Sequence, residues 1–153
     1  MSRRHIGVTG SRGGGTPRQL EALRVILLRG RQALGYGILH HGDCIGIDAE
    51  ADALAKELGY LTICHPPVDP RARAHTTDHM AVMDPAPYLE RNKQIVEVAE
   101  VLLAFPADSK EVLRSGTWAT IRWARRVQKT CMIVPPSGVA RIEDNNDRIS
   151  KVS

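Results

Sequence analysis

The stretch HIGVTGSRGGGTPRQL, residues 5–20, decides the fold class of this chain. Its first part, His5–Thr9, is a short apolar segment typical of a buried strand, and the glycine-rich run Gly10–Gly15 ends it. A helix start follows directly. Thr16 and the glutamine three residues later match a capping box, and Pro17 suits the first helical position. A strand that runs through a glycine-rich turn into a helix is the opening unit of an α/β fold.

The same unit repeats along the chain. Further strands are predicted at residues 37–40, 61–64, 101–105 and 131–134, each separated from the next by one helix or by a helix and a loop. This alternation predicts one Rossmann-like α/β domain, a doubly wound parallel five-stranded sheet with helices on both faces. We expect the domain to span residues 1–136 and residues 137–153 to be a polar tail. Residues 68–87 are predicted to be a long loop and a candidate lid.

The composition agrees with an ordinary globular domain. Of the 153 residues, 42% are hydrophobic and 25% are charged, which excludes disorder over most of the length. The longest apolar runs are too short to span a bilayer, and no signal-peptide core follows the N-terminus, so a cytoplasmic protein is expected. Cys44, Cys64 and Cys131 are odd in number and widely spaced, which predicts reduced, buried thiols rather than a disulfide framework or a zinc ribbon.

The charge balance bears on the partner. Lys and Arg number 21 against 17 Asp and Glu, a net charge of +4, which suits an anionic ligand but is only a mild excess. Aromatic residues make up 4% of the chain and leave few stacking platforms for single-stranded nucleic acid. A small phosphorylated ligand fits this balance better than a nucleic acid.

Three strand-to-helix turns are expected to hold the site. In a doubly wound sheet, ligands bind at the carboxyl ends of the strands, where helix N-termini favour phosphate. The turns enriched in Gly, Ser, Thr and Asp are Gly10–Arg12, Gly42–Asp48 and Ser115–Thr117. The chain lacks the G-x-x-x-x-G-K-[ST] motif of Walker-type ATPases, and its first turn is not the G-x-G-x-x-G of nicotinamide dehydrogenases.

These turns resemble the motifs of the SLOG superfamily, which groups DNA-processing DprA proteins, Lonely Guy (LOG) phosphoribohydrolases and YpsA-like proteins. Residues 7–12 (GVTGSR) look like its opening motif, and residues 42–48 (GDCIGID) are similar to its second glycine motif. Residues 90–92 (ERN) lie where LOG-type members carry an Arg-Lys pair. Pro106 and Ser115–Thr117 resemble the signature P-G-G-x-G-T-x-x-E, split by an insertion. The run after Gly116 is most similar to the YspA/YpsA-related branch.

The resemblance implies a Rossmann-like domain that binds a nucleotide or nucleotide-derived ligand, in an assembly that is commonly a homodimer. LOG members hydrolyse the N-glycosidic bond of nucleoside monophosphates with the Arg of the helix and the last Glu of the signature. Here Thr120 stands at the position of that Glu. Because this hydrolysis requires a carboxylate near the ribose, Glu90 or Asp48 would have to support the sugar cation, with Arg91 positioning the phosphate.

Each candidate residue also has a structural interpretation. Arg12 and Arg91 suit bidentate phosphate contacts but also solvated surface charges, and Glu90 can pair with Arg91. Asp48 can accept a ribose hydroxyl or cap a helix, and Asp43 suits local turn chemistry. The ligand-binding residues that we predict are Gly10, Ser11, Arg12, Gly42, Asp43, Gly46, Asp48, Arg91, Asn92, Ser115, Gly116 and Thr117; the catalytic candidates are Arg91, Glu90 and Asp48.

Two other kinds of site are not favoured. His75 and His79 are four residues apart, but their segment has no helical period and an incomplete ligand set, so we predict no metal and no cofactor. His40 and His41 end a strand, where one should face the core and the other the cleft, without a Ser or Cys partner for a nucleophilic triad. Trp118 is expected in the core.

The leading functional hypothesis is a non-catalytic protein that senses or sequesters a nucleotide-derived ligand. The alternative is an N-glycosidase acting on nucleoside monophosphates. A third hypothesis, binding of single-stranded DNA as in DprA relatives, is weaker because aromatic residues are scarce. We expect no membrane partner and a homodimer or higher homo-oligomer.

Overall fold

Seven strands form one sheet in the order β4-β3-β2-β1-β5-β6-β7. The computed structural model describes residues 2–144. Neighbouring strands are parallel, except that β7 runs antiparallel to β6. The strands are β1 (Arg4–Gly10), β2 (Tyr36–His41), β3 (Leu61–Cys64), β4 (Ala81–Val82), β5 (Val101–Phe105), β6 (Cys131–Ile133) and β7 (Arg141–Glu143).

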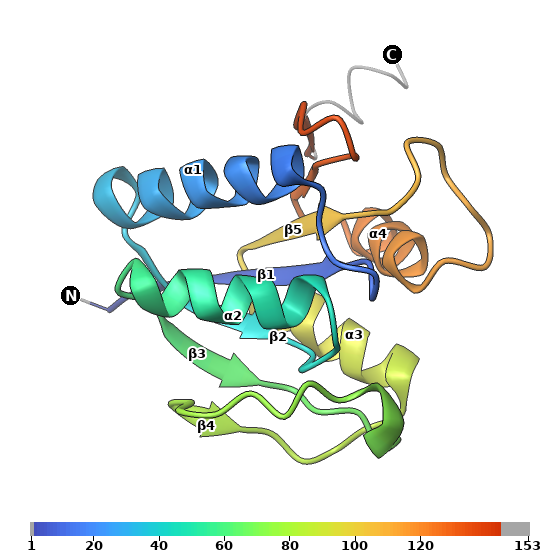
Figure 1. Ribbon diagram of the computed structural model, residues 1–153, viewed down its shortest axis with the longest axis horizontal. Helices are drawn as coiled ribbons and strands as arrows, with labels where there is room; N and C mark the ends of the chain where they lie inside the picture. Colours follow the sequence, from blue (N-terminus) through green and yellow to red (C-terminus); the bar gives the residue numbers. More distant parts are fainter. Residues whose placement is uncertain (1, 145–153) are drawn as a thin grey trace.

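Helices cover both faces of the sheet (Figure 1). The helices are α1 (Pro17–Ala33), α2 (Ile47–Glu57), α3 (Tyr88–Val98) and α4 (Gly116–Arg126), with a short 3-10 turn at Pro70–Ala72. Apolar residues of α1 and α2 pack with Ile6, Val8 and Leu39 on one face. Those of α3 and α4 pack with Leu102 and Ala104 on the other. The Rossmann-like α/β architecture predicted from the alternation of elements is therefore supported.

The first helix begins as its sequence predicts. Thr16 Oγ1 accepts the backbone N–H of Gln19 at 3.1 Å, and Gln19 Oε1 accepts the backbone N–H of Thr16 at 3.0 Å, which completes the capping box. The buried amide of Gln19 also donates to the carbonyl oxygens of Pro106 and Val134, both at 2.9 Å. One local cap thus fastens the helix start to the carboxyl ends of β5 and β6.

The predicted five-strand count is wrong. Short β4 lies within residues 68–87, which the sequence predicts to be a loop, and β7 lies within the predicted tail. Both are edge strands, where polar or exposed side chains are normal and hydrophobic patterning is weak. In β7, Ile142 is 53% exposed and Glu143 accepts from Arg125 Nε at 2.7 Å. Residues 145–153 of the predicted tail lie outside the described residues.

Two further expectations concern the interior. Trp118 is 1% exposed and belongs to the cluster between α3, α4 and the sheet, which confirms its place in the core. Cys44, Cys64 and Cys131 are buried, as predicted. Among the helices of residues 2–144, none has the length and apolar character needed to cross a membrane.

Candidate functional site

The strand order places the site between β1 and β5. From β1 the chain first adds β2 and β3 on one side, and then crosses to β5 on the other. Such a switch point leaves a crevice at the carboxyl ends of the two diverging strands. At this point Ser11 donates its backbone N–H to the carbonyl of Phe105 at 3.1 Å, so the turns that follow β1 and β5 lie side by side.

A cavity of about 390 Å³, which we call the cradle, lies at these turns. Its polar groups come from two arginines, four hydroxyl side chains and the backbone at the start of α4. Among the described residues that line it, none is acidic. The lining residues are Gly10, Ser11, Arg12, Tyr88, Ala107, Arg114, Ser115, Gly116 and Thr117.

The N-terminus of α4 forms one wall of the cradle. Ser115 is the N-cap, and its Oγ accepts the backbone N–H of Trp118 at 3.2 Å. Gly116 and Thr117 occupy the first two helical positions, where N–H groups have no partner within the helix. Opposite them, Ser11 Oγ accepts the N–H of Gly13 at 3.1 Å, which leaves the hydroxyl hydrogen free to donate. The arrangement suits an anion such as phosphate.

A second cavity of about 550 Å³, which we call the side cavity, adjoins the cradle. Arg12 and Tyr88 line both cavities. The other lining residues of the side cavity are mainly apolar, together with one exposed ion pair, Asp69–Arg71 at 2.8 Å. They are Ile45, Pro67, Val68, Asp69, Arg71 and Ala72.

The second glycine turn, residues 42–48, packs behind the cradle instead of opening into it. Gly46 has φ +95°, and a Cβ there would lie 2.3 Å from the carbonyl oxygen of Ser11, so glycine is required at this contact. Asp48 accepts the backbone N–H groups of Gly42 and Cys44, both at 3.1 Å, and so caps the turn, while Gly46 is the N-cap of α2. Burial raises the pKa of Asp48, against the opposing effect of His41 and Arg91.

Arg91 is 1% exposed and holds this turn in place. Its guanidinium donates to the carbonyl oxygens of Gly42 and His65, the latter at 3.1 Å, and to Asn92 Oδ1 at 2.7 Å. Nη2 also lies 3.4 Å from Cys44 Sγ. Neither cavity is lined by Arg91 or Asn92. The guanidinium of Arg91, which the sequence predicts to contact a phosphate, is therefore occupied by hydrogen bonds within the protein.

Asp43 fastens residues 70–76 to the same turn. It has φ +55°, and its carboxylate accepts from Arg73 Nε at 2.8 Å and from the N–H and hydroxyl of Thr76 at 2.9 and 2.6 Å. Burial opposes ionisation, but these hydrogen bonds hold the pKa of Asp43 below its ordinary value. Asp43, a predicted ligand-binding residue, thus holds part of the predicted lid in place through hydrogen bonds to Arg73 and Thr76.

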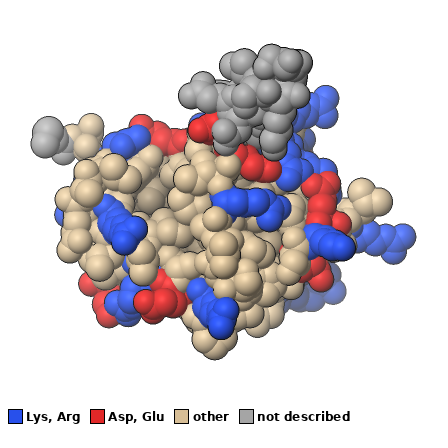
Figure 2. Space-filling model, turned by 90° about the horizontal axis from the view of Figure 1, so that it is seen from above, with Lys and Arg blue, Asp and Glu red and all other residues tan. Residues whose placement is uncertain are grey.

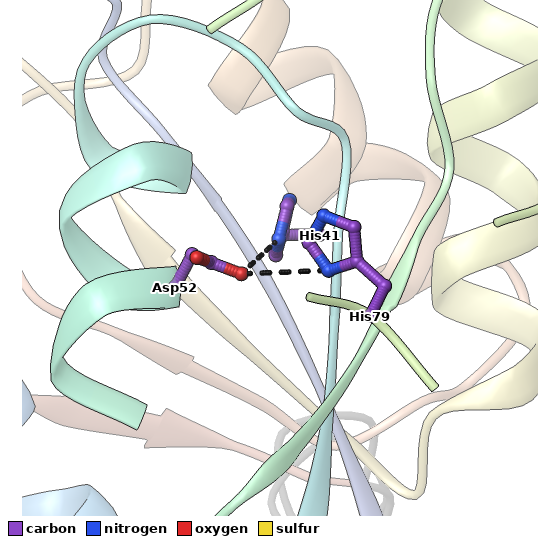
Figure 3. A group of neighbouring side chains, drawn as sticks. All are labelled: His41, Asp52 and His79. Carbon is purple, nitrogen blue, oxygen red and sulfur yellow. Dashed lines mark hydrogen bonds and ion pairs between the residues drawn. The ribbon is translucent and has the colours of Figure 1, made fainter. Parts of the chain in front are cut away.

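Figure 3 shows His41, Asp52 and His79, whose ligand-type atoms lie within 4.8 Å of one another. His41 Nδ1 accepts the backbone N–H of Asp43 at 2.9 Å, so the hydrogen must be on Nε2, which donates to Asp52 at 2.9 Å. A metal would need a free lone pair at that Nε2. Lys56 adds its ammonium at 2.7 Å from Asp52. The proton arrangement therefore suits a hydrogen-bonded clamp better than a metal site.

The histidine expectations need correction. His40 and His41 are both buried, at 3% and 0% exposure, and neither lines the cradle or the side cavity. They lie on opposite faces of the sheet, because successive side chains of a strand alternate. His75 is exposed, while His79 joins the group of Figure 3.

The residues relevant to glycoside hydrolysis lie apart from the cradle. Thr120, at the position of the family Glu, is 3% exposed, and its hydroxyl donates to the carbonyl of Gly116 at 2.9 Å. Glu90 is exposed and lines neither cavity, and Asp48 is buried in its turn.

Basic and acidic side chains are interspersed on the face drawn in Figure 2. They surround a broad uncharged area, without the continuous basic stripe that tracks a nucleic-acid backbone. On this face the charge pattern gives no support to binding of a long polyanion.

Several predicted residues do come together. Of the twelve predicted ligand-binding residues, the cradle unites Gly10, Ser11, Arg12, Ser115, Gly116 and Thr117. Tyr88, Arg114 and Arg71 line the cavities but were not predicted. Tyr88 lies one helical turn before Arg91, so its position on the same helix face as a predicted site residue could have identified it from the sequence. The insertion that carries Arg114 has no such pattern.

Comparison with known proteins rests on the fold. No family model matches the chain, and no curated protein matches it. Solved structures do. The molybdenum cofactor binding protein of the phototrophic bacterium Rippkaea orientalis is 22% identical over 99% of this chain and 84% of that chain, with a TM-score of 0.66. The molybdenum cofactor carrier protein of Chlamydomonas reinhardtii is 23% identical over 86% of this chain and 76% of its own, with a TM-score of 0.62.

DNA processing protein A (DprA) of Streptococcus pneumoniae is 18% identical over 87% of this chain, with a TM-score of 0.67. The chain spans only 50% of that protein's length. The likeness to these three structures confirms the α/β fold that is expected from the resemblance. At these identities the likeness concerns the fold and leaves the ligand open.

Proposed function

We propose that this domain binds a nucleotide or nucleotide-derived ligand without cleaving it, with a phosphate of the ligand in the cradle. The single observation that carries the proposal is the composition of the cradle. Arg12, Arg114 and the N-terminus of α4 supply positive charge and N–H donors, and none of the described lining residues opposes them with a carboxylate.

The same observation favours a binder over an N-glycosidase. Hydrolysis of a glycosidic bond needs a carboxylate beside the sugar, because positive charge develops there. Thr120 bonds to its own helix, and Asp48 is enclosed in the second turn. Asp69 is the acidic residue that lines the side cavity, and it is already paired with Arg71. The hydrolase therefore remains the alternative to be tested.

The structural neighbours add a second candidate ligand. Two of them are named as molybdenum cofactor binding or carrier proteins. Their likeness in fold supports small-molecule binding by this chain, and makes the molybdenum cofactor a candidate beside nucleotides. Similarity to half of DprA does not carry DNA binding over to this chain.

The experiment is mass spectrometry of small molecules after incubation of the pure protein with nucleoside monophosphates, cyclic nucleotides and ADP-ribose derivatives. We expect intact ligand, retained near stoichiometry after rapid desalting, and no released base. Arg114→Gln should weaken retention, whereas Arg24→Gln, a matched exposed change paired with Glu57 away from the cradle, should not. Free base at many equivalents per protein would instead make the chain an enzyme.

Oligomeric state is a separate part of the proposal. We expect a homodimer or larger homo-oligomer, as the family resemblance implies. Size-exclusion chromatography with light scattering measures it directly, and a monomer at micromolar concentration would contradict it.

A further inference from the structure

Two guanidinium groups lie close to the ring of Tyr88, which lines both cavities. The ring of Tyr88 has the guanidinium of Arg91 4.9 Å from its centroid and that of Arg12 at 5.1 Å. The Tyr88 hydroxyl lies beside Gly116, where a Cβ would approach it to 2.4 Å. Tyr88 is thus held by two arginines and by the start of α4.

The two arginines beside Tyr88 differ in their freedom to move. Arg91 is buried, and its guanidinium is bonded to three oxygen acceptors, so it is a fixed support. Arg12 is exposed, in the glycine-rich turn after β1, and lines both cavities. An exposed arginine on a short loop can exchange one contact for another at little cost.

The two cavities, which share Arg12 and Tyr88, offer complementary chemistry. The cradle holds donors and positive charge, and the side cavity offers an apolar wall from Ile45, Pro67, Val68 and Ala72 beside the Tyr88 ring. A phosphate suits the first, and a planar apolar-faced group suits the second.

We propose that Tyr88 is the stacking platform for the planar heterocycle of the ligand, and that Arg12 covers this platform in the free protein and moves to the ligand's anionic group on binding. The inference rests on the proposed function and narrows it to phosphorylated heterocycles. Base–aromatic stacking is stronger than an exposed cation–π contact, so the exchange favours the ligand. Arg12 needs no long movement, because it already lines the cradle.

The test compares nucleoside monophosphates with ribose 5-phosphate, which shares the sugar phosphate and lacks the base. Isothermal titration calorimetry is carried out on the full chain, on Tyr88→Leu, which keeps apolar bulk without a π face, and on Tyr88→Phe, which keeps the ring. Urea denaturation of each variant first establishes that it folds.

We expect the full chain to bind AMP, GMP, CMP or UMP about tenfold more tightly than ribose 5-phosphate. Tyr88→Leu should abolish this preference, with less than a twofold change for ribose 5-phosphate, and Tyr88→Phe should retain it. Equal loss for both classes of ligand in Tyr88→Leu, or no loss for either, would overturn the platform and leave the proposed function standing. Failure of the full chain to bind any of these phosphates would overturn the platform, and it would overturn the proposed function as well if the mass spectrometry described above finds no retained ligand.

Discussion

The two glycine-rich turns beside β1 look alike in sequence and do opposite things. The first turn, Gly10–Arg12, opens into the cradle together with Ser115–Thr117. The second, Gly42–Asp48, is closed by Asp48 and Arg91 and lines no cavity except through Ile45. Arg12 is exposed on the open side, and Arg91 is 1% exposed on the closed side. Burial thus distinguishes an arginine that is bonded within the fold from one whose guanidinium remains accessible to a ligand.

The largest difference is expected in the free energy of unfolding when the same arginine-to-methionine change is made at Arg91 and at Arg12. Arg91→Met leaves the carbonyls of Gly42 and His65 without their donor, and should lower the free energy of unfolding by about 3–5 kcal/mol. Arg12→Met, at an exposed site, should change it by less than about 0.5 kcal/mol. Urea denaturation measures both. Similar losses of unfolding free energy in the two variants would contradict the different roles of Arg91 and Arg12.

Acid should destabilise the closed side. Three histidines connect to this side. The ring of His40 is hydrogen-bonded to the rings of His5 at 2.7 Å and His65 at 2.9 Å, and the backbone carbonyl of His65 accepts from Arg91. Burial, with the neighbouring histidine His65, lowers the pKa of His40 to about 3, and burial with His41 lowers that of His65 to about 4.

Both folded-state pKa values lie below the unfolded value of about 6.5, so the unfolded state binds more protons as the pH falls. Stability should be complete above pH 6.5. Between pH 6.5 and about 4 it should fall by about 1.4 kcal/mol per histidine for each pH unit. Thermal unfolding from pH 7 to 5 measures this slope, and His40→Gln should reduce it by about half. A slope unchanged by that substitution would refute the role of His40.

Removing the N-cap of α1 or of α4 should lower stability in both cases, whereas only the α4 cap should affect ligand binding. Ser115→Ala removes the N-cap of α4 and should cost about 1 kcal/mol, and Thr16→Ala, which removes the N-cap of α1, should cost at least as much. Only Ser115 lines the cradle, so phosphate affinity should fall in Ser115→Ala alone. Calorimetric titration with AMP beside urea denaturation gives both numbers. Equal affinities in the two variants would exclude the Ser115 hydroxyl from the site.

The smallest effect on stability is expected at Arg114. It is exposed and lines the cradle, so Arg114→Gln should leave the unfolding free energy within about 0.5 kcal/mol of the parent. AMP affinity should nevertheless fall by about five- to tenfold, because a charge-assisted contact with phosphate is lost. If Arg114→Gln binds AMP as tightly as the parent protein does, the insertion after β5 does not contribute to ligand binding in the cradle.

Local sequence signals predicted much of the fold. The capping box at Thr16 and the apolar strands each depend on residues close together in the chain, and the structure contains all of them. The two edge strands escaped prediction because β4 has two residues and β7 is polar and half exposed. Their pairing depends on backbone hydrogen bonds to distant strands, which leave little trace in the side chains.

The alternation of strands and helices follows from the sequence alone, because each signal is read over a few consecutive residues. This alternation also indicates the edge of the sheet that holds the candidate site. The sequence also identified the glycine turns as a group. Tertiary packing was needed to show which turn opens into a cavity, which arginine is buried, and that Tyr88 lines both cavities. Burial and stacking are set by residues far apart in the chain that meet only when the sheet is assembled.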